Sequence, residues 1–262
     1  MPEATVNNVR LHYRDAGRGA PLLLLHGLGS SGQIWDGITP ELARSHRVVA
    51  PDLRGHGASA KPRGGYSVRL LADDVVALLD HLGVEAAAVC GLSMGGAIAQ
   101  TLAVDHPARV RALVLEDTWG YSTPAFAAAL TARIQAVREH GLAHYAETAI
   151  PQVFSERFRA ANPRALEEYR ARNAQLDPEA IQSVMRGLIA FDLRGRLATI
   201  RVPTLVVVGS EDRLTPRAHA EYLRRVIPGS RLEVVAGAGH IPHLEAHDVF
   251  TRLLLGFLAA PA

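Results

Sequence analysis

Ser93 has the surroundings of a catalytic nucleophile. It stands at the centre of Gly91-Leu-Ser-Met-Gly95, between a segment expected to form a strand and a segment expected to form a helix. A serine in so sharp a turn takes a strained backbone conformation, which is tolerated only when the residues two positions away are small. The turn lifts the hydroxyl group clear of the sheet, to a helix N-terminus where backbone N–H groups face an incoming anion. The competing interpretation is a glycine-rich turn with an incidental serine.

A serine hydroxyl group needs a base that accepts its proton. Among the twelve histidines, His240 in Ala236-Gly-Ala-Gly-His240 stands just past the last expected strand and before the last expected helix. This order places it at the carboxyl edge of the sheet, where Ser93 is also expected. His243 and His247, on or near the following helix, are alternative bases.

The base in turn needs an acid that orients it. In this type of fold the acid lies between the serine and the histidine in chain order. Asp212 in Gly209-Ser-Glu-Asp212 fits, because it comes directly after the apolar segment 204–208. Asp117, which follows the apolar segment 110–115, is the rival.

The segment His26-Gly27-Leu28-Gly29 follows another apolar run. A glycine-flanked turn lets backbone N–H groups converge on a developing oxyanion, where the loss of one donor typically costs about 3 kcal/mol. The expected donors are the N–H groups of Leu28 and Met94. The alternative is a plain tight turn, in which His26 braces the loop rather than acting as a base.

Short apolar strands must position these side chains. The expected strands cover 9–13, 22–25, 47–50, 86–90, 110–115, 204–208 and 232–235, and the expected helices cover 68–82, 97–105, 216–226 and 249–258. Continuous apolar runs such as Leu22–Leu25 are typical of strands buried on both faces. The alternation of strands and helices predicts an α/β fold, with a parallel sheet covered by helices on both faces and right-handed crossovers.

The alternation stops between residues 120 and 193. This stretch has no strand pattern and carries prolines at positions 124, 151, 163 and 178, which are expected to divide it into short helices. We interpret it as a helical cap inserted into a core formed by residues 1–119 and 194–262. Over 121–190 its eight arginines and seven acidic residues nearly balance, so its composition does not indicate an anionic substrate.

Composition argues against several classes of protein. Of 262 residues, 48% are hydrophobic and 21% charged, which is ordinary for a globular protein, and no apolar run approaches the roughly 20 residues of a membrane-spanning helix. The net charge of +2 is not concentrated in a basic cluster, which argues against a nucleic-acid partner. Cys90 is the only cysteine, which excludes an intrachain disulfide and a multi-cysteine metal site. No secretory signal is visible, so we expect a cytoplasmic enzyme that needs no metal or cofactor.

Five segments together resemble the α/β-hydrolase superfamily. They are His26–Gly29, Pro51–Ser59, Gly91–Gly96, Gly209–Asp212 and Gly237–His240. The resemblance implies a mostly parallel, doubly wound sheet with a helical cap inserted after its sixth strand. It also implies Ser93 as nucleophile, Asp212 as acid and His240 as base. Leu28 and Met94 would then contribute the oxyanion hole.

Within this superfamily, segments 66–84 and 90–118 are most similar to 3-oxoadipate enol-lactonases and related small carboxylesterases. Haloalkane dehalogenases and epoxide hydrolases of the same fold carry Asp at the nucleophile position, where this chain has Ser93. The resemblance therefore implies a serine hydrolase that cleaves a small carboxylic ester or lactone through an acyl-enzyme. Cofactor-free haloperoxidases or perhydrolases and carbon–carbon bond hydrolases keep the same triad and remain alternatives. A ligand receptor with vestigial hydrolysis is the alternative of another class.

Aromatic residues near the start of the cap are expected to line the substrate pocket. The main candidates are Trp119 and Tyr121, followed by Phe126, Tyr145 and Phe154. Trp35, seven residues past Leu28, either walls the pocket or packs in the core. The expected partner is a small-molecule ester or lactone, and the sequence does not indicate an oligomeric state.

Overall fold

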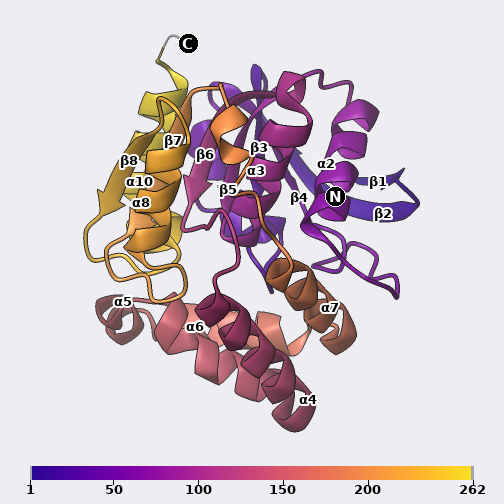
Figure 1. Cartoon of the computed structure of the whole chain (residues 1–262), viewed down its shortest axis with the longest axis vertical. Helices are drawn as coiled ribbons and strands as arrows, with labels where there is room; N and C mark the ends of the chain where they lie inside the picture. The colour runs from indigo at the N-terminus through magenta and orange to yellow at the C-terminus, as the bar shows by residue number, and fades with distance from the viewer. Residues whose placement is uncertain (1, 261–262) are drawn as a thin grey trace.

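The computed structural model of the chain describes residues 2–260, which form an eight-stranded sheet between layers of helices, with further helices gathered at one end (Figure 1). The strands are β1 (Glu3–Val6), β2 (Val9–Ala16), β3 (Ala20–Leu25), β4 (His46–Pro51), β5 (Ala87–Leu92), β6 (Val110–Glu116), β7 (Thr204–Gly209) and β8 (Arg231–Val235). Their order is β1-β2-β4-β3-β5-β6-β7-β8. β2 pairs antiparallel with β1 and with β4, and every other neighbouring pair is parallel. The predicted α/β fold with a mostly parallel sheet is confirmed.

The central strand β3 is buried on both faces. Its residues Leu22–Leu25 are fully buried. Successive side chains of a strand point to opposite faces of the sheet. Leu22 and Leu24 therefore pack in one hydrophobic cluster, and Leu23 and Leu25 pack in another. A fully apolar run at this position is the consequence of helices on both sides of the sheet.

Helices cover each face of the sheet. The long helices α2 (Val68–His81), α3 (Met94–Asp105) and α8 (Arg217–Val226) belong to the face of Leu23 and Leu25, whereas α1 (Thr39–Leu42) and α10 (His247–Leu258) belong to the face of Leu22 and Leu24. The short helices are η1 (Gly32–Trp35), η2 (Pro107–Arg109), η3 (Leu197–Thr199) and α9 (Pro242–Glu245). The doubly wound arrangement is therefore as predicted.

The cap follows β6, the sixth strand along the described chain, and consists of α4 (Pro124–Val153), α5 (Glu156–Ala161), α6 (Pro163–Ala174) and α7 (Pro178–Ile189). Three of the four prolines stand at the first position of a helix, where a missing N–H costs nothing. The expectation that Pro151 divides two helices is wrong, because it lies within the last turns of α4. The break in α4 is at Gly141 instead, whose φ of 76° suits glycine.

Two chain segments connect the cap to the core, and they hydrogen-bond to each other. The N–H group of Leu193 donates to the Gly120 carbonyl at 3.0 Å, and that of Ser122 donates to the Phe191 carbonyl at 2.8 Å. The cap thus leaves the core after β6 and returns before β7 through one paired neck, which places it over the carboxyl ends of the parallel strands (Figure 1).

A buried ion pair holds the loop after β4. Arg54 donates from Nε and Nη2 to the two carboxylate oxygens of Asp74 on α2, both at 2.6 Å. Asn7 donates to the same carboxylate at 2.7 Å, and Asp74 is fully buried. The loop also carries Leu53, whose N–H group donates to Nε2 of His26 at 3.0 Å. The ion pair therefore also supports the loop after β3.

Replacing Asp74 with alanine should lower the free energy of unfolding by about 3–5 kcal/mol, because the Arg54 guanidinium is left buried without a counter-ion. Urea unfolding followed by circular dichroism measures this change. Glu3→Ala is the control, because its pair with Arg10 is exposed on both sides and should contribute less than about 1 kcal/mol. Equal losses in the two variants would contradict a structural role for the buried pair.

Candidate active site

The turn between β5 and α3 holds Ser93 in a strained conformation. Its φ of 55° and ψ of −115° lie outside the regions that residues with a side chain usually adopt. A Cβ atom at Gly91 would approach the Gly95 carbonyl oxygen to 2.3 Å, and one at Gly95 would approach the Leu25 carbonyl oxygen to 2.1 Å. Both distances are far below van der Waals contact, so glycine is required on each side of the serine.

Two hydrogen bonds fix this turn to the end of β6 and the loop that follows it. The N–H group of Ser93 donates to the Glu116 carbonyl at 2.9 Å, and Oγ1 of Thr118 donates to the Ser93 carbonyl at 2.7 Å. A strained residue persists only where its surroundings hold it from several sides. Ser93 lines the cavity between core and cap, so the strain serves to present its hydroxyl group there.

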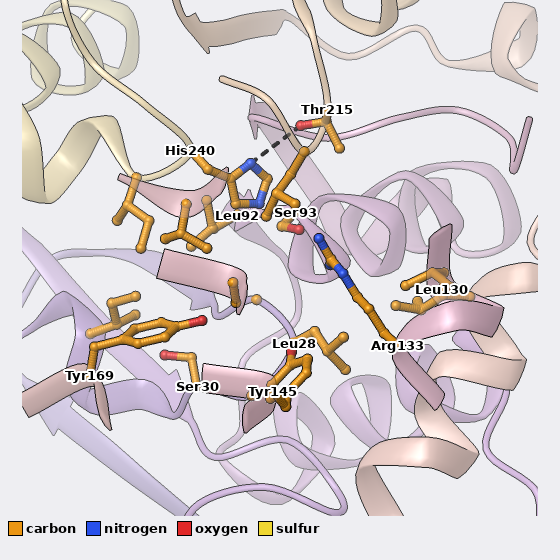
Figure 2. Close-up of a pocket in the computed structure, with 18 of the residues that line it drawn as sticks. Leu28, Ser30, Leu92, Ser93, Leu130, Arg133, Tyr145, Tyr169, Thr215 and His240 are labelled. Carbon is orange, nitrogen blue, oxygen red and sulfur yellow. Dashed lines mark hydrogen bonds between the residues drawn. The ribbon is translucent and has the colours of Figure 1, made fainter. Parts of the chain in front are cut away.

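His240 and Asp212 lie at the same edge of the sheet, on the loops that follow β8 and β7. Nδ1 of His240 lies 2.9 Å from Oδ2 of Asp212, and both side chains are buried. A carboxylate only accepts, so Nδ1 carries the proton and Nε2 is the free acceptor. Figure 2 shows this second ring nitrogen on the side of Ser93. This free Nε2 is the ring atom that would accept a proton from the Ser93 hydroxyl group.

Hydrogen bonds stabilise the ionised form of Asp212. Oγ1 of Thr215 donates to Oδ2 at 2.6 Å, and the N–H groups of Leu214 and Thr215 donate to Oδ1 at 2.8 and 3.2 Å. Burial alone would raise the pKa of this carboxyl group. The charge of His240 and the side-chain hydrogen bonds outweigh burial, and the pKa of Asp212 lies below its ordinary value. Thr215 was not expected from the sequence, although a hydroxyl three residues after an aspartate is typical of such a turn.

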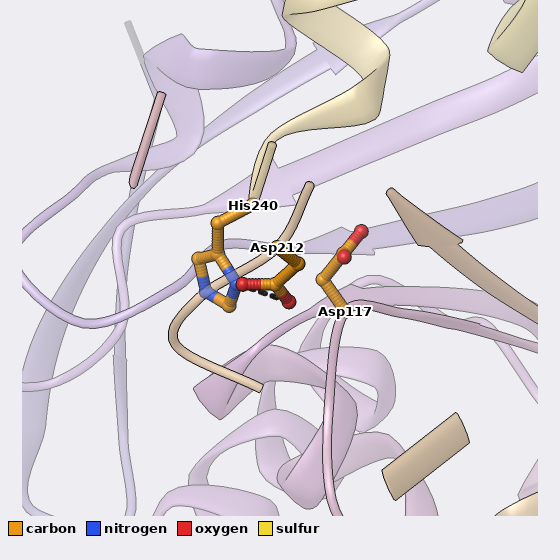
Figure 3. A group of neighbouring side chains, drawn as sticks. All are labelled: Asp117, Asp212 and His240. Carbon is orange, nitrogen blue, oxygen red and sulfur yellow. Dashed lines mark hydrogen bonds and ion pairs between the residues drawn. The ribbon is translucent and has the colours of Figure 1, made fainter. Parts of the chain in front are cut away.

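Asp117 lies next to Asp212, and Figure 3 shows Asp212 between it and His240. Within residues 2–260, these three are the one group of His, Cys, Asp and Glu side chains that could hold a metal ion, with one atom of each within 4.8 Å of the others. A metal would have to replace the direct hydrogen bond between His240 and Asp212. We therefore interpret the group as a hydrogen-bonded triad with an adjacent carboxyl group.

The alternative bases lie elsewhere. Nδ1 of His243 donates to Glu116 at 2.8 Å, and its ring stacks on Trp35 with 4.2 Å between centroids. His247 lies partly exposed at the start of α10. Neither lines the cavity that contains Ser93.

The loop after β3 lies beside Ser93 and holds one of the two expected oxyanion donors. Leu28 lines the cavity, and Met94 is the first residue of α3. Among the described residues, neither backbone N–H group donates a hydrogen bond, so both are available to an oxyanion. His26 braces this loop by accepting from the Leu53 N–H group, and burial lowers its pKa to about 4, which keeps it neutral.

The cap also contacts the loop that carries His240. The N–H group of His240 donates to the carbonyl of Val153, at the end of α4, at 2.8 Å. The N–H group of Ser155 donates to Glu245, on α9, at 3.1 Å. The position of His240 therefore depends on the cap as well as on β8.

A cavity of about 60 Å³ lies between core and cap. Of the aromatic residues expected around it, Trp119, Phe126 and Tyr145 line it. Tyr169 also lines it and was not expected. Such a small free volume leaves room for a short acyl group in this arrangement of the cap.

Three expected pocket residues lie outside this cavity. Trp35 is fully buried, because η1 directs its indole ring toward His243 in the core. Tyr121 stands in the neck of the cap, where its ring packs against Tyr222. Phe154 stacks on another cap side chain instead of facing the cavity. A residue that is near a cavity residue in sequence need not direct its side chain into the cavity.

Two arginines of the cap line the cavity, and the sequence analysis did not single them out. Figure 2 shows the guanidinium group of Arg133, on α4, directed toward Ser93. Its Nη2 donates to Gln152 at 2.5 Å. Arg172, on α6, has a buried Nε with no hydrogen-bond partner among the described residues, and burial lowers its pKa from the ordinary value. Within residues 2–260, neither arginine forms an ion pair with a carboxylate.

Comparison with known proteins agrees with this geometry. Residues 20–247 match a family model described as the alpha/beta hydrolase fold. The chain belongs to the α/β-hydrolase family. This hydrolase is 35% identical over 250 residues to 3-oxoadipate enol-lactonase 2 from Acinetobacter baylyi, an alignment that covers 95% of this chain and 92% of that protein.

Solved structures give the same result. The enol-lactonase from Burkholderia xenovorans LB400 superposes on the hydrolase with a TM-score of 0.94 and 32% identity, covering 99% of this chain and all of that one. Est816, described as an N-acyl homoserine lactone degrading enzyme, gives a TM-score of 0.87 and 34% identity, covering 98% of this chain and 100% of that one. The hydrolase thus shares its fold, over nearly its whole length, with enzymes described as acting on lactones. None of its described helices combines the length and hydrophobicity that crossing a bilayer requires.

Asp212→Asn should lower kcat by about 10⁴-fold while leaving the fold intact, because the amide stabilises the wrong tautomer of His240. Turnover of p-nitrophenyl acetate and the circular dichroism spectrum measure the two effects. Asp117→Asn, the same chemical change at the neighbouring carboxyl group, should have a much milder effect. If the two results are reversed, the orienting acid is the one that follows β6.

Proposed function

We propose that the hydrolase cleaves small esters or lactones that carry a carboxylate group, through an acyl-enzyme on Ser93. The observation that carries this proposal is the presence of Ser93, His240 and two cap arginines without acidic partners around one cavity. The enzymes named among its relatives, two enol-lactonases and a lactone-degrading enzyme, support the reaction class. They also favour an enzyme over a ligand receptor.

In the first half of the reaction, Nε2 of His240 accepts the proton of the Ser93 hydroxyl as Oγ attacks the carbonyl carbon. The N–H groups of Leu28 and Met94 donate to the oxyanion that forms. Asp212 stabilises the imidazolium. His240 then gives its proton to the leaving alkoxide, the ester C–O bond breaks, and the acyl group remains on Ser93.

In the second half, water replaces the alcohol and the same steps run again. His240 accepts a proton from water, the hydroxide oxygen attacks the acyl carbon, and the bond to Oγ breaks as Ser93 regains its proton. Water is the only co-reactant that the balance of atoms requires. From a lactone, the alcohol stays attached to the acyl chain, so the product is a single acid.

The two arginines indicate what else the substrate carries. A guanidinium group held partly out of water is stabilised by a carboxylate, whose two oxygens match its donors. The free Nε of Arg172 offers such a donor, and Arg133 places another near Ser93 (Figure 2). A substrate carboxylate would supply the counter-ion that residues 2–260 do not, only a few bonds from the reacting carbonyl.

The nucleophile can be tested by covalent labelling. Phenylmethylsulfonyl fluoride at neutral pH should add one adduct to the intact mass, and peptide mapping should place it on Ser93. Ser93→Ala should abolish labelling and reduce turnover to the residual of about 10³–10⁴ over water that binding and the oxyanion hole provide. Labelling should slow at acidic pH, because a protonated imidazole at His240 cannot accept the serine proton. Esterase activity that persists in Ser93→Ala would place the chemistry elsewhere.

Matched esters test the substrate class. The p-nitrophenyl ester of hemisuccinate should have a higher kcat/KM than that of butyrate, which has the same chain length without the carboxylate. Arg133→Gln and Arg172→Gln should each lower kcat/KM for hemisuccinate by about 10- to 100-fold, the value of a charged hydrogen bond, and change butyrate little. The dodecanoate ester should be slowest, because the cavity is small.

Arg138→Gln is the control for these variants. It lies on the same helix as Arg133, but its Nε donates to Gln182 outside the cavity, so hemisuccinate turnover should not change. Equal losses for hemisuccinate and butyrate would show that the arginines support the cap rather than bind a carboxylate. Faster turnover of long-chain esters than of short ones would contradict the limit on acyl size.

A further inference from the structure

The carboxyl group of Asp117 is a buried acid that the reaction above does not use. Asp117 follows β6 directly and is 1% exposed. Its Oδ1 accepts a hydrogen bond from the Gly209 N–H group at 2.9 Å, whereas its Oδ2 is buried with no partner among the described residues. Its φ of 43° lies in the left-handed region, which Asp and Asn tolerate better than most residues. The chain thus holds a polar side chain at a constrained position directly behind the catalytic acid.

Asp117 and Asp212 lie close together in a buried site. One oxygen of each lies within 4.8 Å of the other and of a ring nitrogen of His240. Two carboxylates in a buried site repel each other, so one of the pair keeps a proton. Asp212 has donors from His240, Thr215 and two backbone N–H groups, while Asp117 has one backbone N–H group. Asp212 accepts more hydrogen bonds, so its carboxyl group is the ionised one, and the proton stays on Asp117.

The charges around Asp117 favour the same assignment. Burial raises the pKa of its carboxyl group well above the ordinary range, and the charges of Asp212 and the adjacent Glu116 raise it further. His240 lies beyond Asp212, and His219 on α8 is near enough to interact with the charge of Asp212. Both histidines therefore act mainly on Asp212, and neither forms a hydrogen bond with Asp117.

We propose that Asp117 is a positioning residue, whose protonated carboxyl group donates a hydrogen bond to the Asp212 carboxylate and holds it in place for His240. The unpartnered Oδ2 is then the donor, and the contact exists only while it keeps the proton. The imidazolium that forms during the reaction meets one carboxylate charge instead of two. This proposal rests on the proposed role of Asp212 as the orienting acid.

Stability as a function of pH tests whether Asp117 holds a proton. A group whose pKa is raised in the folded state contributes stability below its unfolded pKa, near 3.9 for Asp, and loses that contribution as pH rises toward the folded pKa. Asp117→Asn keeps both hydrogen bonds without needing a proton. From about pH 5 upward, the unfolding constant of the native hydrolase should therefore rise tenfold per pH unit relative to the variant, for as long as Asp117 stays protonated.

Urea unfolding of both proteins between pH 5 and 8 gives this ratio. A ratio that does not change with pH would show that Asp117 is ionised when folded, and it would overturn the proposal. Because unfolding requires no turnover, this result is independent of whether the proposed reaction is correct.

Kinetics test the positioning role. Asp117→Gly removes the donor but tolerates the positive φ, and it should lower kcat about tenfold with little change in KM, the loss of one hydrogen bond to a charged group. Asp117→Asn should restore most of this loss, because its amide donates to Asp212 in the same way. Equal kcat in the glycine and asparagine variants would overturn the positioning role. A loss in Asp117→Asn as large as in Asp212→Asn would overturn it too, because Asp117 would then be the acid itself.

Discussion

The close approach of the β5–α3 turn to the end of β3 is the constraint on which the active site depends. Gly95 lies so near the Leu25 carbonyl that no side chain fits, and the same crowding forces Ser93 into its strained backbone conformation. The turn therefore lies beside the loop after β3, whose residue Leu28 lines the cavity together with Ser93. One packing contact thus sets both the proposed nucleophile and the loop proposed to stabilise the oxyanion.

The placing of Ser93, Asp212 and His240 at one edge of the sheet could be predicted, because it follows from strand order. Ser93, Asp212 and His240 each follow a different strand, and β5, β6, β7 and β8 are consecutive parallel neighbours. Residues just past the ends of such strands meet at one edge of the sheet wherever the intervening helices lie. Local motifs plus strand order therefore suffice to place these three residues together, and the lack of a strand pattern between residues 120 and 193 gave the place of the cap.

The lining of the cavity could not be predicted in the same way, because it depends on how the cap helices pack. The composition of the cap gives only the balance of its charges, whereas the structure shows that Arg133 and Arg172 line the cavity. Arg133 stands between Leu130 and Val137 on the buried side of α4, and an arginine at that spacing was the signal available in the sequence. The close pairing of Asp117 with Asp212 required coordinates, since sequence presents them as rivals.

The hydrogen bonds between cap and histidine loop bear on how such enzymes are recombined. A cap exchanged for that of a relative at its paired neck would keep these contacts only if its own backbone places a carbonyl group at His240, as Val153 does, and an N–H group at Glu245, as Ser155 does. The cap should therefore be exchanged together with the loop it contacts, so that segment 120–193 and loop 236–245 come from the same protein. Wherever the two backbones differ, a chimera that exchanges the cap alone would lose a support of the loop that carries His240.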